Sequence, residues 1–135
     1  MKVLSTRAHG ILDYLAGVLL IAAPFILGFD RGGAETWVPV IVGIVILLQA
    51  LMTNFEVGMF RVMSMNMHLN MDYLIGAFLA VSPWIFNFDE YVYLPHLIAG
   101  IALILEAMIT RVVPEHGAAT RQPYNRGTMN HGHTH

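Results

Sequence analysis

The chain has 135 residues, of which 56% are hydrophobic and 12% charged, and its formal net charge is −2. The length suits a single domain, and the charged fraction is about half of the roughly 25% that is usual in soluble domains. The absence of cysteine excludes disulfides and thiolate chemistry. The acidic net charge, with no basic patch in residues 1–110, argues against a nucleic-acid partner.

Four apolar segments are predicted to be transmembrane helices, and they cover roughly residues 9–29, 36–54, 68–88 and 92–111. The charge-free parts of the first and third segments are 16 residues long and reach only about 24 Å, short of the roughly 30 Å hydrocarbon core. These two helices must therefore begin earlier, at His9 and His68, if they are to cross a membrane. A soluble bundle would show a polar stripe on each helix, whereas residues 38–48 carry no polar side chain.

One block of sequence occurs twice. His9, Asp13, Tyr14 and Gly17 return 59 positions later as His68, Asp72, Tyr73 and Gly76. A second block returns 57 positions later: Ile41, Gly43, Ile44, Leu48, Ala50 and Thr53 recur as Ile98, Gly100, Ile101, Leu105, Ala107 and Thr110. The chain is therefore predicted to be a tandem duplication of a two-helix hairpin. The repeats span 9–53 and 68–110, a loop at 54–67 joins them, and together they make a transmembrane domain over 1–113.

The distribution of basic residues predicts the orientation of this domain. Six of the seven Lys and Arg residues lie before the first helix, in the middle loop or after the fourth helix, and only Arg31 lies in the other two loops. The positive-inside rule then places both termini and the middle loop in the cytoplasm. The first segment also mimics a signal peptide, but the same block recurs in mid-chain, so it is expected to be retained.

The third segment ends with Ser82, Pro83 and Trp84, and the first segment has Ala23, Pro24 and Phe25 at the equivalent place. Together with the repeated His/Asp/Tyr pattern, this motif resembles the SPW-repeat family of small bacterial membrane proteins. The resemblance implies two transmembrane helices per repeat, with the motif in the first, and a location in the bacterial inner membrane. It implies no activity or cofactor. From the residues themselves, Pro83 is interpreted as a helix end and Trp84 as an interfacial anchor.

Polar residues recur at similar depth near the cytoplasmic side, and the candidate cluster comprises His9, Asp13, Gln49, His68, Asp72 and Glu106. One interpretation is a proton relay or an ion or ligand site. The interpretation we favour is structural: Asp13 and Asp72 lie in first turns as helix caps, and Glu106 bonds a neighbouring helix. A metal site is a third interpretation, because histidines and carboxylates ligate metals, but spacing does not fix their mutual distances.

The middle loop is rich in methionine. Met63, Met65 and Met67 resemble a thioether site for Cu(I). The favoured alternative is a surface helix, since Phe55, Met59, Met63, Met67 and Met71 repeat every four residues and would form an apolar stripe on the membrane. From Pro114 the composition predicts a disordered cytoplasmic tail. In that tail, His131, His133 and His135 are weak candidates for adventitious metal binding.

The sequence predicts a non-enzymatic scaffold or accessory subunit that forms a homo-oligomer or joins a larger membrane complex. No catalytic residue and no cofactor are expected. The first alternative is a small proton- or ion-coupled transporter or channel that uses the polar cluster, and the second is copper binding by the middle loop. A wet cavity lined by Asp13, Asp72 and Glu106 would favour transport, whereas a dry bundle with a flat lateral interface would favour a scaffold.

Overall fold

The computed structural model describes residues 2–112, and this part of the chain forms four α-helices and no β-strand. The helices are α1 (Thr6–Ile26), α2 (Ala34–Met52), α3 (Met65–Ile85) and α4 (Leu94–Ile109). The all-α prediction with four helices is therefore confirmed. The predicted tail from Pro114, which includes His131, His133 and His135, lies outside the described residues.

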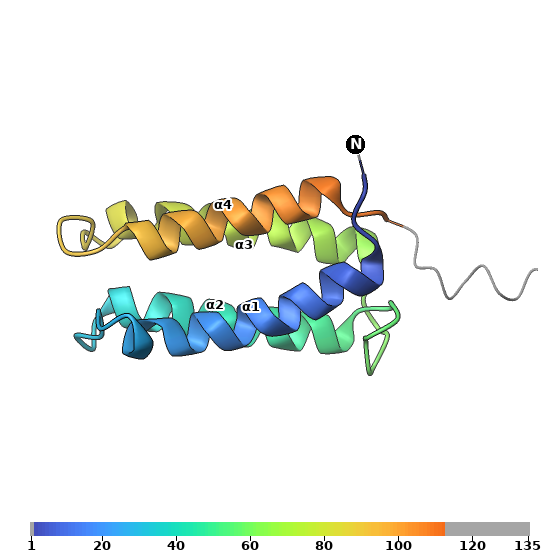
Figure 1. Ribbon diagram of the computed structural model, residues 1–135, viewed down its shortest axis with the longest axis horizontal. Helices are drawn as coiled ribbons and strands as arrows, with labels where there is room; N and C mark the ends of the chain where they lie inside the picture. The colour runs from blue at the N-terminus through green and yellow to red at the C-terminus, as the bar shows by residue number, and fades with distance from the viewer. Residues whose placement is uncertain (1, 113–135) are drawn as a thin grey trace, which may run out of the picture.

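The helices pair as two hairpins, α1 with α2 and α3 with α4 (Figure 1). The short α1–α2 and α3–α4 loops lie at one end of the bundle, and the N-terminus and the α2–α3 loop lie at the other. Glycines allow close packing inside each hairpin. A Cβ added to Gly43 would lie 2.6 Å from the carbonyl oxygen of Gly17, and one added to Gly76 would lie 2.8 Å from that of Gly100. The backbones therefore touch within each hairpin, as small residues permit in apolar surroundings.

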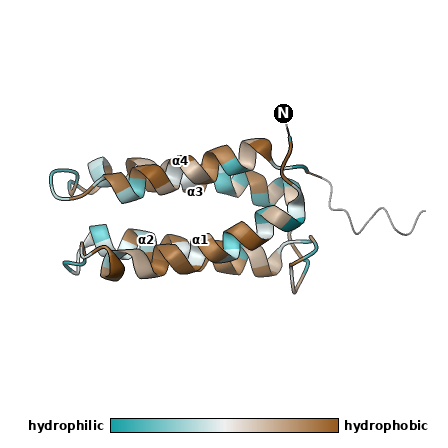
Figure 2. Cartoon of the chain, in the orientation of Figure 1, coloured by the Kyte–Doolittle hydropathy of each residue, from teal (hydrophilic) through white to brown (hydrophobic). Residues whose placement is uncertain are grey.

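All four helices contribute to one apolar core, whose buried members are Leu20, Val38, Val42, Ile46, Leu79 and Leu103. Figure 2, coloured by hydropathy, shows that apolar residues run along the length of the helices and that polar residues lie mainly towards their ends. Among the described residues, α1 and α2 are long and apolar enough to cross a membrane. Helix α4 is apolar but has 16 residues, and α3 is less apolar although it has 21. Two of the four predicted spans thus meet both requirements.

The helices α1 and α3 begin three residues earlier than predicted because a serine precedes each one. The Ser5 hydroxyl accepts a hydrogen bond from the Ala8 amide at 3.1 Å, and the Ser64 hydroxyl accepts one from the Met67 amide at 3.2 Å. These are N-caps. Asp13 and Asp72 consequently lie in the third turn of their helices, and no acidic residue occupies the first turn of either. The prediction that the two aspartates cap first turns is wrong.

The predicted surface helix of methionines is also wrong, because residues 54–64 are not helical. The amides of this loop instead bind the free carbonyl groups at the end of α2. The Leu51 carbonyl accepts hydrogen bonds from Met59 and Phe60, and the Met52 carbonyl accepts them from Val62 and Met63. Within the loop and the first turn of α3, Phe55 and Met65 are buried, whereas Met67 is 57% exposed. The candidate thioethers face different surroundings, and copper binding stays a prediction.

Each repeat motif lies at the far end of its helix. The Pro24 carbonyl accepts a hydrogen bond from the Phe29 amide at 3.0 Å, and the Pro83 carbonyl accepts one from Phe88 at 2.8 Å. The buried Ser82 hydroxyl donates to the Leu79 carbonyl at 2.7 Å. The Trp84 side chain is 47% exposed. A helix that ends just after Pro83 and an exposed Trp84 side chain are the two features that we expect if the motif is a helix end with an interfacial anchor.

Candidate functional site

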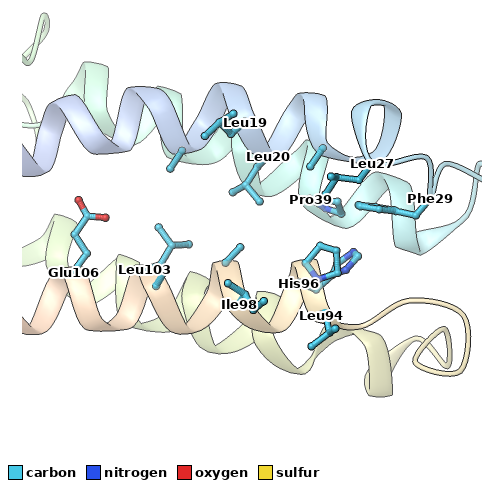
Figure 3. Close-up of a pocket in the computed structure, with 15 residues that line it drawn as sticks. Leu19, Leu20, Leu27, Phe29, Pro39, Leu94, His96, Ile98, Leu103 and Glu106 are labelled. Atoms are coloured by element: carbon cyan, nitrogen blue, oxygen red, sulfur yellow. The ribbon is translucent and has the colours of Figure 1, made fainter.

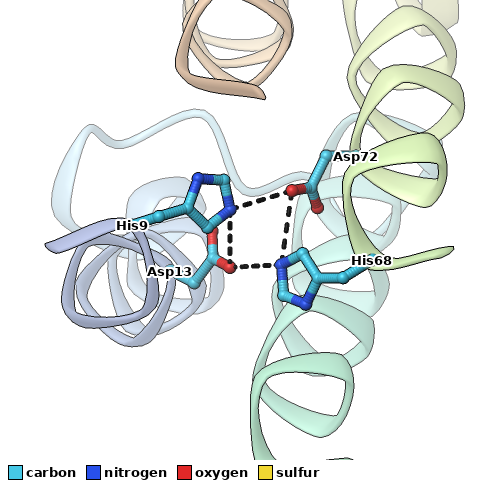
Figure 4. A group of neighbouring side chains, drawn as sticks. All are labelled: His9, Asp13, His68 and Asp72. Atoms are coloured by element: carbon cyan, nitrogen blue, oxygen red, sulfur yellow. Dashed lines mark hydrogen bonds and ion pairs between the residues drawn. The ribbon is translucent and has the colours of Figure 1, made fainter. Parts of the chain in front are cut away.

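Four buried side chains, two from each repeat, meet between α1 and α3 (Figure 4). They are His9 and Asp13 from α1 and His68 and Asp72 from α3, and none is more than 1% exposed. Each offers one inward-facing atom, Nε2 of a histidine or Oδ2 of an aspartate, and these atoms all lie within 4.8 Å of one another. We call this group the His–Asp ring.

The shorter contacts of the ring join the two repeats. His9 Nε2 lies 2.9 Å from Asp72 Oδ2, and His68 Nε2 lies 2.7 Å from Asp13 Oδ2. Within one helix, the His9–Asp13 and His68–Asp72 distances are 3.2 and 3.3 Å. The spacing of four residues places each pair on one helix face, and the duplication brings the two faces together. Each histidine therefore lies within reach of both carboxylates.

Two threonines fix the orientation of the histidine rings. His9 Nδ1 lies 2.8 Å from the Thr110 hydroxyl, and His68 Nδ1 lies 2.6 Å from the Thr53 hydroxyl. Each hydroxyl donates its own hydrogen to the carbonyl four residues earlier, at 2.6 Å in both cases. Because a hydroxyl has one hydrogen, it accepts from the imidazole, so Nδ1 carries a proton in both histidines. The other nitrogen, Nε2, then faces the carboxylates.

These threonines were not among the predicted site residues. The signal was nevertheless present, because Thr53 and Thr110 are equivalent residues of the second repeated block. Each also bonds the histidine of the other repeat. A third missed residue is Phe55, whose ring centroid lies 5.8 Å from that of His68 and which is completely buried. The α2–α3 loop that carries Phe55 therefore covers one side of the ring.

Gln49 and Glu106, the last two residues of the predicted cluster, approach the ring differently. The Gln49 amide donates to Asp72 Oδ1 at 2.6 Å. Glu106 is its equivalent in the second repeat, and its Oε1 atom lies 3.6 Å from His9 Nδ1, beyond hydrogen-bond distance. Within residues 2–112, Asp13 Oδ1 and Glu106 Oε1 are buried without a hydrogen-bond partner. The structure thus brings all six predicted residues together. Gln49 Oε1 is likewise buried without a partner among the described residues, but in the half of the cluster that contains Gln49 both carboxylate oxygens of Asp72 are bonded.

A cavity of about 430 Å³ separates the two hairpins between α1 and α4 (Figure 3). Its walls are almost entirely apolar and include Leu19, Leu20 and Leu103. Glu106 lies at the end nearer the His–Asp ring, and His96 lies at the opposite end. The cavity therefore runs between two polar side chains, both of which belong to α4.

The comparison with protein families identifies this architecture. The model of the SPW repeat domain matches residues 7–110, which include nearly all of the four helices. The chain belongs to the SPW repeat family. No curated protein matches the chain, and no solved structure matches it. Family membership and the two apolar helices of membrane length support a membrane protein.

The two hairpins of this SPW repeat protein also meet at the end opposite the ring. The buried His96 lies between Phe29 and Phe88, with ring centroids 5.3 and 4.8 Å away, and its Nε2–H donates to the Glu35 carbonyl at 2.9 Å. On the surface, the Arg31 guanidinium stacks over the Tyr91 ring, 3.9 Å from its centroid. Contacts between the SPW repeats therefore close both ends of the space that contains the cavity.

Proposed function

We propose that this SPW repeat protein is a small cation-coupled carrier of the bacterial inner membrane. The observation that carries the proposal is the His–Asp ring, in which four ionisable side chains, each at most 1% exposed, meet inside an apolar helical bundle. Ionisable groups within membrane helices are costly and usually belong to ion or substrate pathways. Each repeat contributes one histidine and one aspartate to the ring, so the site requires both copies of the duplicated hairpin.

The arrangement of the hairpins supports a carrier. Direct backbone contact at the glycines makes each hairpin a tightly packed unit, whereas a cavity of about 430 Å³ lies between the hairpins. Carriers built from repeats operate largely by moving one repeat against the other around a site at the interface. In this protein, the ring at one end and the His96–Glu35 contact at the other are the two places where such a movement would open the cavity.

Four membrane crossings are part of the proposal. Helix α3 is the copy of α1 and, at about 1.5 Å per residue, its 21 residues extend roughly 31 Å. Because α4 is the copy of α2, the same topology follows for the second hairpin. The basic residues then place the ring near the cytoplasmic side. Reporter fusions at residue 58 and after residue 113 should be cytoplasmic, and fusions at 33 and 90 external. A cytoplasmic reporter at 33 would contradict this orientation.

A scaffold or accessory subunit is the second candidate, and one observation favours it. The four inward atoms of the ring are separated by only 2.7–3.3 Å around its edge, so the ring also holds the hairpins together. The structure shows neither the wet cavity that would favour transport nor the dry bundle that would favour a scaffold. Its cavity reaches Glu106 but neither Asp13 nor Asp72, and the lining is mostly apolar. A scaffold would form a homo-oligomer or join a larger complex through its lipid-facing helices. No enzymatic activity is proposed.

Cation flux in liposomes distinguishes the two candidates. The carrier proposal predicts flux of protons or divalent cations down an imposed gradient, and it predicts that Asp72→Asn abolishes this flux. Asp89→Asn is the matched control, because it makes the same change in the α3–α4 loop, away from the ring. Helicity by circular dichroism and elution as one species verify that both variants fold. Absence of flux in the unaltered protein, or full flux in Asp72→Asn, would overturn the carrier.

A further inference from the structure

We propose that the His–Asp ring binds one divalent transition-metal ion, with Nε2 of His9 and His68 and the carboxylates of Asp13 and Asp72 as ligands. The inference deepens the proposed function, because it names the cation, and it rests on that function only for what the bound ion does in transport. Two histidines and two aspartates, both of which are common metal ligands, converge from α1 and α3. Their four ligand atoms all lie within 4.8 Å of one another, close enough to surround one ion.

The distances suit a metal centre. Four ligands that surround Zn²⁺ tetrahedrally at bond lengths of about 2.0–2.1 Å lie about 3.3–3.4 Å from one another. The two ring edges within a helix measure 3.2 and 3.3 Å and already match this separation. The two edges that join the repeats measure 2.9 and 2.7 Å. The two edges that join the repeats would lengthen by a few tenths of an ångström. The diagonals of the ring are bounded by 4.8 Å, so a tetrahedral centre also requires opposite ligands to lie about 3.3–3.4 Å apart.

The surrounding residues orient the ligands as metal sites require. In most metal sites, a ligating histidine donates its other ring N–H to an oxygen atom, which fixes the ring and its tautomer. Here Thr110 and Thr53 accept those N–H groups, so both Nε2 atoms face the centre. The Gln49 amide holds Asp72 Oδ1 at 2.6 Å and turns the other carboxylate oxygen inward. Three of the four ligands are therefore held by neighbouring side chains before an ion binds.

An unpartnered atom gives independent support. Asp13 is completely buried, and its Oδ1 atom has no hydrogen-bond partner among the described residues. A buried carboxylate oxygen without a partner is costly. An ion at the centre of the ring would offer this carboxylate a second contact, because aspartate binds metals through one or both oxygens. This oxygen belongs to the one proposed ligand that has no hydrogen bond to a described residue outside the ring.

The ligand types indicate the class of metal. Two imidazoles and two carboxylates suit Zn²⁺ and the neighbouring divalent ions of the first transition row, whereas thioethers suit Cu(I) and oxygen-only sites suit Ca²⁺. A divalent ion with two carboxylates and two neutral imidazoles has no net charge, which keeps the burial cost of the site low. Binding should release protons from the ring, because metal ligands must be deprotonated.

Zinc stoichiometry tests the proposal directly. The protein in mild detergent carries His116→Ala, His131→Ala, His133→Ala and His135→Ala, so that the histidines after residue 113 contribute nothing. After equilibration with Zn²⁺ and desalting, elemental analysis should find one ion per chain, and Co²⁺ should show the visible spectrum of a four- or five-coordinate site. Adding Asp13→Asn and His68→Gln should abolish retention. Thr110→Val leaves every ligand in place and should weaken zinc affinity by about 10- to 100-fold.

Zinc retention, zinc affinity and cation flux together separate the metal site from the carrier. No retained zinc in the protein without tail histidines, or unchanged retention in the Asp13→Asn/His68→Gln variant, would overturn the metal site. If that variant does not fold, unaltered affinity in a folded Thr110→Val protein overturns it instead. Zinc binding without any cation flux keeps the metal site and removes the carrier. Proton flux that depends on Asp72, without zinc binding, keeps the carrier and removes the metal site.

Discussion

Gln49 in the first repeat and Glu106 in the second occupy equivalent places beside the ring, yet they bond differently. Gln49 donates to Asp72, whereas Glu106 borders the cavity and leaves Asp13 Oδ1 without a partner. A similar contrast appears at the other end, where Pro39 in the first repeat corresponds to His96 in the second. The two repeats therefore form a nearly symmetric ring, but they differ at two positions, and the additional ionisable side chains lie on α4, at the two ends of the cavity.

The largest effect is expected from removing a ring carboxylate. Asp72→Ala and Asp13→Ala each leave buried imidazoles without one acceptor, and breaking such a buried pair costs about 3–5 kcal/mol. Asp72→Ala should cost more, by about 1 kcal/mol, because it also removes the acceptor that lies 2.6 Å from the Gln49 amide, which then keeps only its 3.4 Å hydrogen bond to the His68 carbonyl. Thermal or denaturant unfolding in detergent measures the difference. Equal losses below 1 kcal/mol would mean that the ring contributes no more than a surface ion pair.

A smaller effect, equal in both repeats, is expected where helix backbones touch. Gly43→Val and Gly100→Val, which are equivalent positions of the two repeats, place side-chain atoms against the carbonyl oxygens of Gly17 and Gly76, within 2.6 Å of the new Cβ. Overpacking of this kind typically costs about 1–3 kcal/mol. The exposed Ala102 offers a matched control, since Ala102→Val should change stability by less than about 0.5 kcal/mol. A marked difference between the two glycine variants would show that the hairpins are not equivalent in packing.

Exchanging the amide and the acid should shift stability in opposite directions. Glu106→Gln gives the second repeat the neutral amide that the first repeat has, so Asp13 Oδ1 gains a donor and stability rises by about 0.5–1.5 kcal/mol. Gln49→Glu removes the donor from Asp72 and adds a carboxylate beside it, so stability falls by about 1–3 kcal/mol. The same unfolding assay applies. Loss of stability in Glu106→Gln would show that the carboxylate is already well paired.

The repeat motifs should give the smallest effect. Ser82→Ala makes the second motif resemble the first at this position and removes one hydrogen bond to the Leu79 carbonyl, at a cost of about 0.5–1.5 kcal/mol. Trp84→Phe copies the aromatic residue of the first motif at an exposed site, and stability should change by less than about 0.5 kcal/mol. A severe loss in Trp84→Phe would show that the indole does more than anchor the helix end.

Local patterns in the sequence predicted most of the fold. The apolar runs predicted four helices, and the repeated blocks predicted two equivalent hairpins. The spacing of four residues between His9 and Asp13 placed both on one face. Helix starts were missed by three residues, although Ser5 and Ser64 are N-cap residues by type. The periodicity of the methionines predicted a surface helix that does not form. The backbone amides after α2 bind the free carbonyl groups at its end, and the loop therefore does not continue as a helix.

The sequence by itself therefore determined the helices, their pairing and which polar residues share a face, because these depend on hydrogen bonds and apolar patterns over a few turns. Only the tertiary structure decided that His9 pairs with Asp72 and His68 with Asp13, and that each histidine bonds the threonine of the other repeat. These partners lie far apart along the chain, so their distances depend on how the hairpins pack. The same packing decided that Glu106, unlike Gln49, borders a cavity.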